Sequence, residues 1–324
     1  MHAWLCDQPT GVDALRWTEL PTPHPTTTQV RIKIHAASLN FPDLLTVQNK
    51  YQIKPPLPFT PGSEFSGVID AVGEGVRHVK VGARVATIGV TGGFATHACV
   101  EAPAVMPLPA GFDLDDAAAF AFTYGTSHHA LIDRAALRAG ETVLVLGAAG
   151  GVGSAAVQIA KAAGARVIAA ASNQEKCSFC QRLGADQALD TSTDNFRQAL
   201  KAATDGNGPD VVYDPVGGDL AEVAFRSIAW RGRYLVIGFA AGPIPALPWN
   251  LALLKGAAIV GVFWGDHVRR EPKAFRLALA ELFDWYAQGK VKPAIDSRLP
   301  MRDLTEAYAR MGSRQVCGKL LLVN

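Results

Sequence analysis

A glycine-rich stretch in the middle of the chain, Ala148-Ala-Gly-Gly-Val-Gly153, has the residue types and spacing of a phosphate-binding loop. It follows the apolar run 142–147 and precedes a segment of helical composition, 154–164. The loop matches the dinucleotide-binding pattern G-x-G-x-x-G with Ala148 in the first position. Gly150 then lets backbone amides approach a pyrophosphate, and Gly153 lets the helix pack closely on the strand. The residues predicted to contact the cofactor are Ala149, Gly150, Gly151, Val152 and Gly153. The alternative interpretation of the loop is a tight turn that binds no ligand.

A second informative position ends the next apolar run, Val167-Ile-Ala-Ala-Ala-Ser172. Strands at this place in dinucleotide-binding folds commonly end on an acid, which binds the ribose hydroxyls and repels an added 2′-phosphate. This chain has Ser172 there, with Lys176 four residues later. Since a hydroxyl and a cation favour a phosphate, the pair predicts NADPH in preference to NADH. The alternative is that Lys176 is a solvated residue in the first turn of a helix.

Further strand candidates alternate with helical segments through this region, as in α/β proteins with a parallel sheet. They cover 188–191, 210–214, 233–239 and 258–263. With the two strands beside the glycine loop they predict a doubly wound, six-stranded parallel sheet.

The bulk composition is that of a chain large enough for two domains. It has 324 residues, 49% of them hydrophobic, and a formal net charge of +2 with interspersed charges, so no nucleic-acid partner is indicated. The first residues lack the pattern of a signal peptide, and the uncharged window 234–254 is interrupted by three prolines and two glycines. We therefore expect a cytoplasmic location and no membrane segment. Of five cysteines, Cys177 and Cys180 have redox-pair spacing, but two thiols on a helix are the favoured interpretation.

The segments that flank this region carry the motifs of a known superfamily. Residues 25–110 are β-rich in composition and contain Pro61-Gly-Ser-Glu-Phe-Ser-Gly-Val-Ile69 and Val79-Lys-Val-Gly-Ala-Arg-Val-Ala86, and the chain ends with Gly318-Lys-Leu-Leu-Leu322. With the glycine loop, these motifs resemble the medium-chain dehydrogenase/reductase superfamily. Asn40-Phe-Pro-Asp43, Tyr51 and the double glycine resemble its zinc-free quinone oxidoreductase (zeta-crystallin-like) branch most.

The resemblance implies an α/β fold with a GroES-like, β-rich catalytic domain and a Rossmann domain inserted into it. The expected boundaries are 1–122 and 265–324 for the two parts of the catalytic domain, and 123–264 for the NADPH-binding domain. A homodimer is also expected from the resemblance, with the edge strand 258–263 as a candidate contact.

Zinc ligands of the superfamily are absent at the matching positions. Zinc-dependent relatives have a cysteine where Asn40 stands, a histidine within 62–64 where this chain has Ser63, and four closely spaced cysteines where it has Cys99 alone. His128 and His129 are adjacent, so on a helix their rings point about 100° apart and cannot both face one ion. No metal site is predicted.

Without a Lewis acid, alkoxide chemistry is disfavoured, and hydride addition to a quinone or an α,β-unsaturated carbonyl compound is expected. By resemblance, the catalytic residues are Asn40, Asp43, Tyr51 and Thr126, with Tyr51 either a proton donor or a packing ring, and Asp43 an orienting group. The resemblance adds four cofactor contacts: Gly238, Phe239, Phe263 and Lys319.

Two other functions remain open at the level of sequence. The substrate could be an acyl thioester such as an enoyl-CoA, since the same chemistry serves both substrates. The chain could also be a low-turnover NADPH-binding protein, although retention of Asn40, Tyr51 and Thr126 argues against a pure binder. Two departures from the family pattern, Leu45 and Thr191, stand where many relatives have tyrosines.

Overall fold

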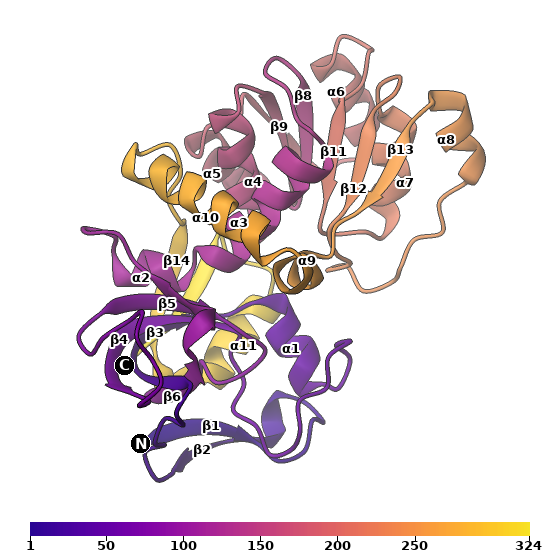
Figure 1. Ribbon diagram of the computed structural model, residues 1–324. Helices are drawn as coiled ribbons and strands as arrows, with labels where there is room; N and C mark the ends of the chain where they lie inside the picture. The colour runs from indigo at the N-terminus through magenta and orange to yellow at the C-terminus, as the bar shows by residue number, and fades with distance from the viewer. The chain divides into compact units, whose positions relative to one another are not determined.

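The computed structural model describes residues 1–324 and divides into two compact units (Figure 1). The first unit comprises Met1–Phe122 and Ile295–Asn324, and the second comprises Thr123–Ala294. The predicted mixed α/β fold is confirmed, with one β-rich unit and one unit built on a parallel sheet.

The first unit is built on a seven-stranded sheet with the order β14-β15-β3-β4-β5-β7, in which β6 also pairs with β3. Strand β14 runs parallel to β15, and the other neighbours are antiparallel. The strands are β3 (Gln29–Ser38), β4 (Glu64–Val72), β5 (Arg84–Ile88), β6 (His97–Glu101), β7 (Val105–Pro107), β14 (Ile295–Pro300) and β15 (Lys319–Val323). A separate hairpin pairs β1 (His2–Cys6) with β2 (Leu15–Glu19).

Strand β3 shows why this sheet forms. Its alternating sequence places Val30, Ile32 and Ile34 on one face, where all three are buried in the core of the unit. Three short helices complete the unit, and α2 packs on β3, β4 and β5. They are α1 (Phe41–Val47), α2 (Leu114–Ala118) and α11 (Leu304–Gly312).

The second unit contains the predicted six-stranded sheet, and every neighbouring pair in it is parallel. The order is β10-β9-β8-β11-β12-β13. Strands β9 and β10 are added on one side of β8, and β11, β12 and β13 are added on its other side, so the strand order reverses between β8 and β11. The strands are β8 (Thr142–Leu146), β9 (Arg166–Ala171), β10 (Gln187–Asp190), β11 (Val211–Asp214), β12 (Arg233–Val236) and β13 (Ala258–Gly261). This is the order of doubly wound dinucleotide-binding sheets, whose ligands bind beyond the carboxyl ends of the strands.

The helices of this unit connect the strands and cover the sheet. They are α3 (Ala121–His128), α4 (Gly151–Ala162), α5 (Gln174–Arg182), α6 (Phe196–Ala203), α7 (Asp219–Ser227), α8 (Trp249–Lys255), α9 (Trp264–Arg270) and α10 (Pro272–Ala287). A π-helical segment, His129–Arg134, continues α3. Cys177 and Cys180 both lie on α5, where their side chains are buried and form no disulfide.

Two strands end earlier than predicted. The prediction extended β12 to residue 239 and β13 to residue 263, but they end at Val236 and Gly261. The chain turns after β12 because the amides of Ile237 and Gly238 bond back to the carbonyl of Asp214 on β11. The uncharged window 234–254 is a strand, a loop and part of α8, and no helix is both long and apolar enough to span a bilayer.

Helices α9 and α10 belong to the compact unit that contains the parallel sheet. The domain boundaries predicted from the sequence instead assign residues 265–324 to the catalytic domain. Contacts within the unit explain their position: Glu281 of α10 contacts His128, and the backbone of Lys292 bonds to Gln158 of α4. The functional domain boundaries stay a prediction.

Candidate cofactor and catalytic sites

The glycine loop connects β8 to α4 at the point where the strand order reverses. A β-carbon on Gly153 would lie 2.3 Å from the carbonyl oxygen of Gly147 and 2.8 Å from the Cα of Ala148, so only glycine allows this close packing. A β-carbon on Gly150 would meet only the oxygen of Gly147, at 3.3 Å. Gly150 precedes the first turn of α4, whose amides have no partners within the helix. The local geometry therefore suits a pyrophosphate.

Ser172 and Lys176 lie together at the carboxyl end of β9. Asn173 caps α5 by accepting a hydrogen bond from the backbone amide of Lys176, at 2.9 Å. The Lys176 ammonium in turn donates to the Ser172 hydroxyl at 3.3 Å. Thr191, which follows β10, bonds to the carbonyl of Ala171 at the same strand end. The Asn173 cap thus fixes the backbone of Lys176, whose side chain is buried and whose ammonium lies beside the Ser172 hydroxyl.

Asp214, at the carboxyl end of β11, organises the next loop and was missed by the sequence analysis. Its carboxylate accepts hydrogen bonds from the amides of Val216 and Gly217, each at 2.8 Å, and from the Tyr234 hydroxyl at 2.5 Å. Burial and this carboxylate raise the pKa of Tyr234 well above its usual value, so the phenol remains a donor. An Asp followed by Pro-Val-Gly-Gly is the sequence signal, because aspartate often accepts from amides two or three residues later.

Phe239 lies against the loop that Asp214 holds. A β-carbon on Gly217 would approach its ring to 2.9 Å, so the glycine makes room for the aromatic side chain. Gly238 precedes it in the same turn, and Phe263 follows β13 with its ring about half exposed. All these residues follow carboxyl ends of parallel strands and therefore share one edge of the sheet with the glycine loop.

Thr126 belongs to the second unit as part of α3 and is buried. The neighbouring Ser127 fixes this helix to the sheet, because its hydroxyl lies 2.9 Å from that of Tyr213 on β11 and donates to the carbonyl of Val152 at the start of α4. The structure thus places Thr126 beside elements that carry the glycine loop.

The other three predicted catalytic residues lie in the first unit, two at the start of α1 and one after its end. Asn40 is the N-cap of this helix, and its backbone amide donates to the Asp43 carboxylate at 2.8 Å. Asp43 is 2% exposed, and burial raises its pKa to about 6. Tyr51 follows α1, and burial and the charge of Asp43 raise the pKa of its phenol. A raised pKa keeps the phenol protonated at neutral pH, the form that can donate a hydrogen bond.

The side chain of Asn40 is held by two buried charged groups, the Glu64 carboxylate and the Lys319 ammonium. Glu64 on β4 is fully buried and accepts from the Ser38 hydroxyl at 2.7 Å and from the Phe122 amide at 2.7 Å. Lys319 on β15 places its ammonium 2.6 Å from the Asn40 side-chain oxygen and 3.7 Å from the Glu64 carboxylate. Burial lowers the pKa of Lys319, and the carboxylates of Glu64 and Asp43 oppose that change.

Lys319 was expected to contact the cofactor, but its ammonium is enclosed by Asn40, Glu64 and the carbonyl of Leu39. In this arrangement it acts by orienting the Asn40 amide. Direct contact between Lys319 and a cofactor stays a prediction.

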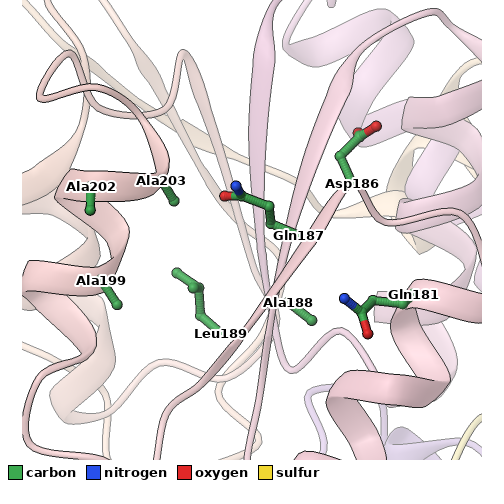
Figure 2. A pocket seen from close by; sticks show the side chains of 8 residues that line it. All are labelled: Gln181, Asp186, Gln187, Ala188, Leu189, Ala199, Ala202 and Ala203. Carbon is green, nitrogen blue, oxygen red and sulfur yellow. The ribbon is translucent and has the colours of Figure 1, made fainter.

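A surface cavity of about 400 Å³ lies beside the edge strand β10 of the parallel sheet (Figure 2). Its lining includes Gln181 of α5, Gln187 and Leu189 of β10, and Ala199 of α6. None of the candidate cofactor residues contributes to it, so this cavity is distinct from the predicted nucleotide site.

The raised pKa of Asp43 predicts a specific pH dependence of stability. Between about pH 4 and pH 6 the folded chain keeps a proton that the unfolded chain releases, so this group's contribution to stability falls as the pH rises. In Asp43→Asn, which retains a side-chain oxygen for the Asn40 amide, this dependence is lost. The quantity to compare is the free energy of unfolding of the unmodified chain minus that of the variant. This difference should fall by up to about 3 kcal/mol as the pH rises from about 4 to about 6. Urea titrations at several pH values measure it, and a constant difference between the two proteins would contradict the prediction.

Comparisons with known proteins agree with this architecture. The family models described as alcohol dehydrogenase GroES-like domain and zinc-binding dehydrogenase match residues 26–110 and 151–283. A quinone oxidoreductase-like protein 2 homolog from Nematostella vectensis is 37% identical over 91% of this chain and 82% of its own length.

Among solved structures, Escherichia coli quinone oxidoreductase complexed with NADPH is 26% identical, with a TM-score of 0.91 and full coverage of both chains. The enoyl reductase CurK is 27% identical, with a TM-score of 0.88 and 99% coverage of both chains. The chain therefore belongs to the medium-chain dehydrogenase/reductase superfamily, in its quinone oxidoreductase-like branch.

Proposed function

We propose that this protein is an NADPH-dependent reductase that transfers hydride to a quinone or an α,β-unsaturated carbonyl compound. The observation that carries the proposal is the Ser172–Lys176 pair at the end of β9, beside a glycine loop that suits a pyrophosphate. A hydroxyl and a cation replace the acid that would repel a 2′-phosphate. The neighbouring structure that holds NADPH, from the same superfamily, supports the same cofactor.

Each candidate cofactor residue except Lys319 has a proposed part. Backbone amides of Ala149 to Gly153 bind the pyrophosphate, Ser172 and Lys176 bind the 2′-phosphate, and Gly238, Phe239 and Phe263 border the nicotinamide half. NADPH, when bound, supplies the hydride. Thr126 and Asn40 hold the nicotinamide ribose and the substrate oxygen through hydrogen bonds.

We propose that the reaction proceeds without a catalytic zinc ion. Asn40 is surrounded by the Glu64 carboxylate, the Ser38 hydroxyl and the Lys319 ammonium, and no cysteine or histidine is among these partners. A buried ammonium already balances the carboxylate, so these residues do not fit a zinc site, whose catalytic form takes three protein ligands. Negative charge that develops on a conjugated oxygen is then stabilised by hydrogen-bond donors. The Tyr51 phenol delivers the proton to the resulting enolate.

An acyl thioester such as an enoyl-CoA is the second candidate substrate. The likeness to the enoyl reductase CurK favours it, since that protein matches over the whole chain. Both substrates present a conjugated double bond to the same hydride, so they differ only in the group that flanks the carbonyl.

We also propose a homodimer formed along the edge of the parallel sheet. Apolar side chains are exposed on α8, in the loop before it, and at or near the edge strand β13: Trp230, Ile244, Trp249, Leu253, Leu254 and Ile259. Apolar patches of this kind commonly mark protein interfaces. Sedimentation velocity should report twice the 34.3 kDa chain mass, and a single-chain mass would exclude the dimer.

The function is tested by following nicotinamide absorbance with NADPH or NADH against a quinone, a simple enone, an enoyl-CoA and, in reverse, an alcohol. We expect NADPH to be preferred, with turnover on electron-poor alkenes or quinones that persists in the presence of a chelator. The best acceptor separates quinone from thioester chemistry. Tight NADPH binding without turnover on any acceptor would instead identify a binding protein.

The Lys176→Ala variant should lose affinity for NADPH selectively, because it removes a charge-assisted hydrogen bond to the 2′-phosphate. We expect the KM for NADPH to rise roughly ten-fold to a hundred-fold, with the KM for NADH nearly unchanged. Lys201→Ala, which removes an exposed lysine of α6, is the matched control. An equal rise for both cofactors would refute the role of Lys176.

The Tyr51→Phe variant should slow enone reduction at saturating substrate, since it removes the proposed proton donor but keeps the ring. A loss of about a hundred-fold in kcat is expected, with NADPH affinity retained. Unaffected turnover would identify Tyr51 as a packing residue.

A further inference from the structure

The neighbours of Asn40 determine which way its side-chain amide faces. The amide oxygen, Oδ1, lies 2.6 Å from the Lys319 ammonium. The amide nitrogen, Nδ2, lies 3.4 Å from a Glu64 carboxylate oxygen and 3.5 Å from the Ser38 hydroxyl oxygen. An ammonium only donates hydrogen bonds, and a carboxylate only accepts them. Exchanging the amide oxygen and nitrogen would therefore bring two donors together at Lys319 and two acceptors together at Glu64.

Both charged neighbours are fixed by other contacts. Glu64 is fully buried and accepts hydrogen bonds from the Ser38 hydroxyl and the Phe122 amide, each at 2.7 Å. The Lys319 ammonium is buried as well and donates to a backbone carbonyl at 2.8 Å. Neither group can leave Asn40 without losing partners in a place that water does not reach. The fold therefore determines the orientation of the amide.

One hydrogen of the Asn40 amide is left for a ligand. The Ser38 hydroxyl donates to the same Glu64 oxygen that contacts Nδ2, and these two oxygens lie 2.7 Å apart. Because they are so close together, both lie on one side of Nδ2 and share one of its two hydrogens. Since Oδ1 is bound by Lys319, the group that the amide offers to a ligand is the other N–H.

A fixed donor suits a substrate oxygen that gains negative charge. When hydride adds to a conjugated carbonyl compound, charge develops on the carbonyl oxygen, and a preorganised N–H stabilises it without reorienting during the reaction. The opposite charges of Glu64 and Lys319 lie 3.7 Å apart and balance each other. They therefore fix the donor without adding net charge beside the substrate.

We propose that Glu64 and Lys319 are positioning residues that fix Asn40 as a hydrogen-bond donor to the carbonyl oxygen of the substrate. This role rests on the proposed function and divides its two tasks: Asn40 binds the substrate oxygen, and Thr126 binds the nicotinamide ribose.

The step is balanced as follows for an enone. Hydride transferred from NADPH, which leaves NADP⁺, forms a C–H bond at the β-carbon. The C=C electron pair shifts toward the carbonyl carbon, and the C=O pair moves onto oxygen to give an enolate. Asn40 donates a hydrogen bond to that oxygen and keeps its proton. The proton that completes the reduction goes from Tyr51 to the α-carbon.

The Asn40→Ala variant separates the two tasks by steady-state kinetics. We expect kcat with an enone to fall about a hundred-fold to a thousand-fold, the range found when one oxyanion donor is removed. The KM for NADPH should stay within about two-fold of its value in the unmodified chain. A raised KM for NADPH with unchanged kcat would assign Asn40 to the ribose and overturn the proposal.

The double variant Lys319→Met/Glu64→Gln tests the positioning role. It removes both buried charges together, so neither is left unpaired. We expect kcat to fall about ten-fold, part of the full contribution of the donor, with the KM for NADPH unchanged. Ser66→Ala is the matched control, because it removes a buried hydrogen bond of the same strand, to the carbonyl of Leu114, and should lower stability without changing kcat. Unchanged kcat in the double variant would contradict the positioning role.

Nuclear magnetic resonance of the unmodified chain tests the orientation without turnover. With ¹⁵N-labelled asparagine, the Asn40 side-chain signals are identified by their absence from Asn40→Ala. We expect a nuclear Overhauser effect between these hydrogens and the Ser38 β-methylene. An effect to the Lys319 ε-methylene in its place would overturn the proposal. If the unmodified chain reduces no acceptor, the proposed function fails, whereas this measurement still decides the orientation.

Discussion

The buried ammonium of Lys319 sets the geometry of the β-rich unit around Asn40. An ion removed from water is tolerated only where partners surround it, and here the partners are the Glu64 carboxylate, the Asn40 side chain and a backbone carbonyl. These groups come from β15, β4 and the start of α1, so the three elements must meet at one point. Removing either charge would leave the other buried and unpaired. The position of the Asn40 amide thus follows from the pairing of strands far apart in the sequence.

In the parallel-sheet unit, the common direction of the strands determines where the candidate cofactor residues lie. Because all six strands run the same way, every strand ends at the edge that carries the glycine loop. Short polar contacts then shape each loop, such as the Asn173 cap before Lys176 and the amides held by Asp214. The sheet supplies a common edge, and local hydrogen bonds determine what each loop presents there.

The sequence predicted the features that depend on near neighbours. The glycine loop, the six strands, and Ser172 with Lys176 could be identified because each is encoded within a short segment. Strand ends at Val236 and Gly261 could not, since they depend on hydrogen bonds between strands.

Other features could not be predicted from the sequence because they also depend on contacts between distant segments. Lys319 lies in a motif that was recognised, but its burial against Glu64 depends on strands β15 and β4. The position of 265–294 likewise follows from contacts of α10 and Lys292 with α3 and α4.

The place of β15 in its sheet also determines the order in which the chain can fold. This strand lies between β14 and β3, and both β14 and β15 come from the last thirty residues, Ile295–Asn324. During synthesis, the residues of the parallel-sheet unit leave the ribosome before these strands do, and domains generally fold as units. The second unit can therefore fold while the first still lacks part of its sheet. Until β15 arrives, residues 36–38 of β3 lack a partner strand on one side and Glu64 lacks the Lys319 ammonium. A nascent chain can therefore hold a folded parallel-sheet unit while the β-rich unit is still incomplete.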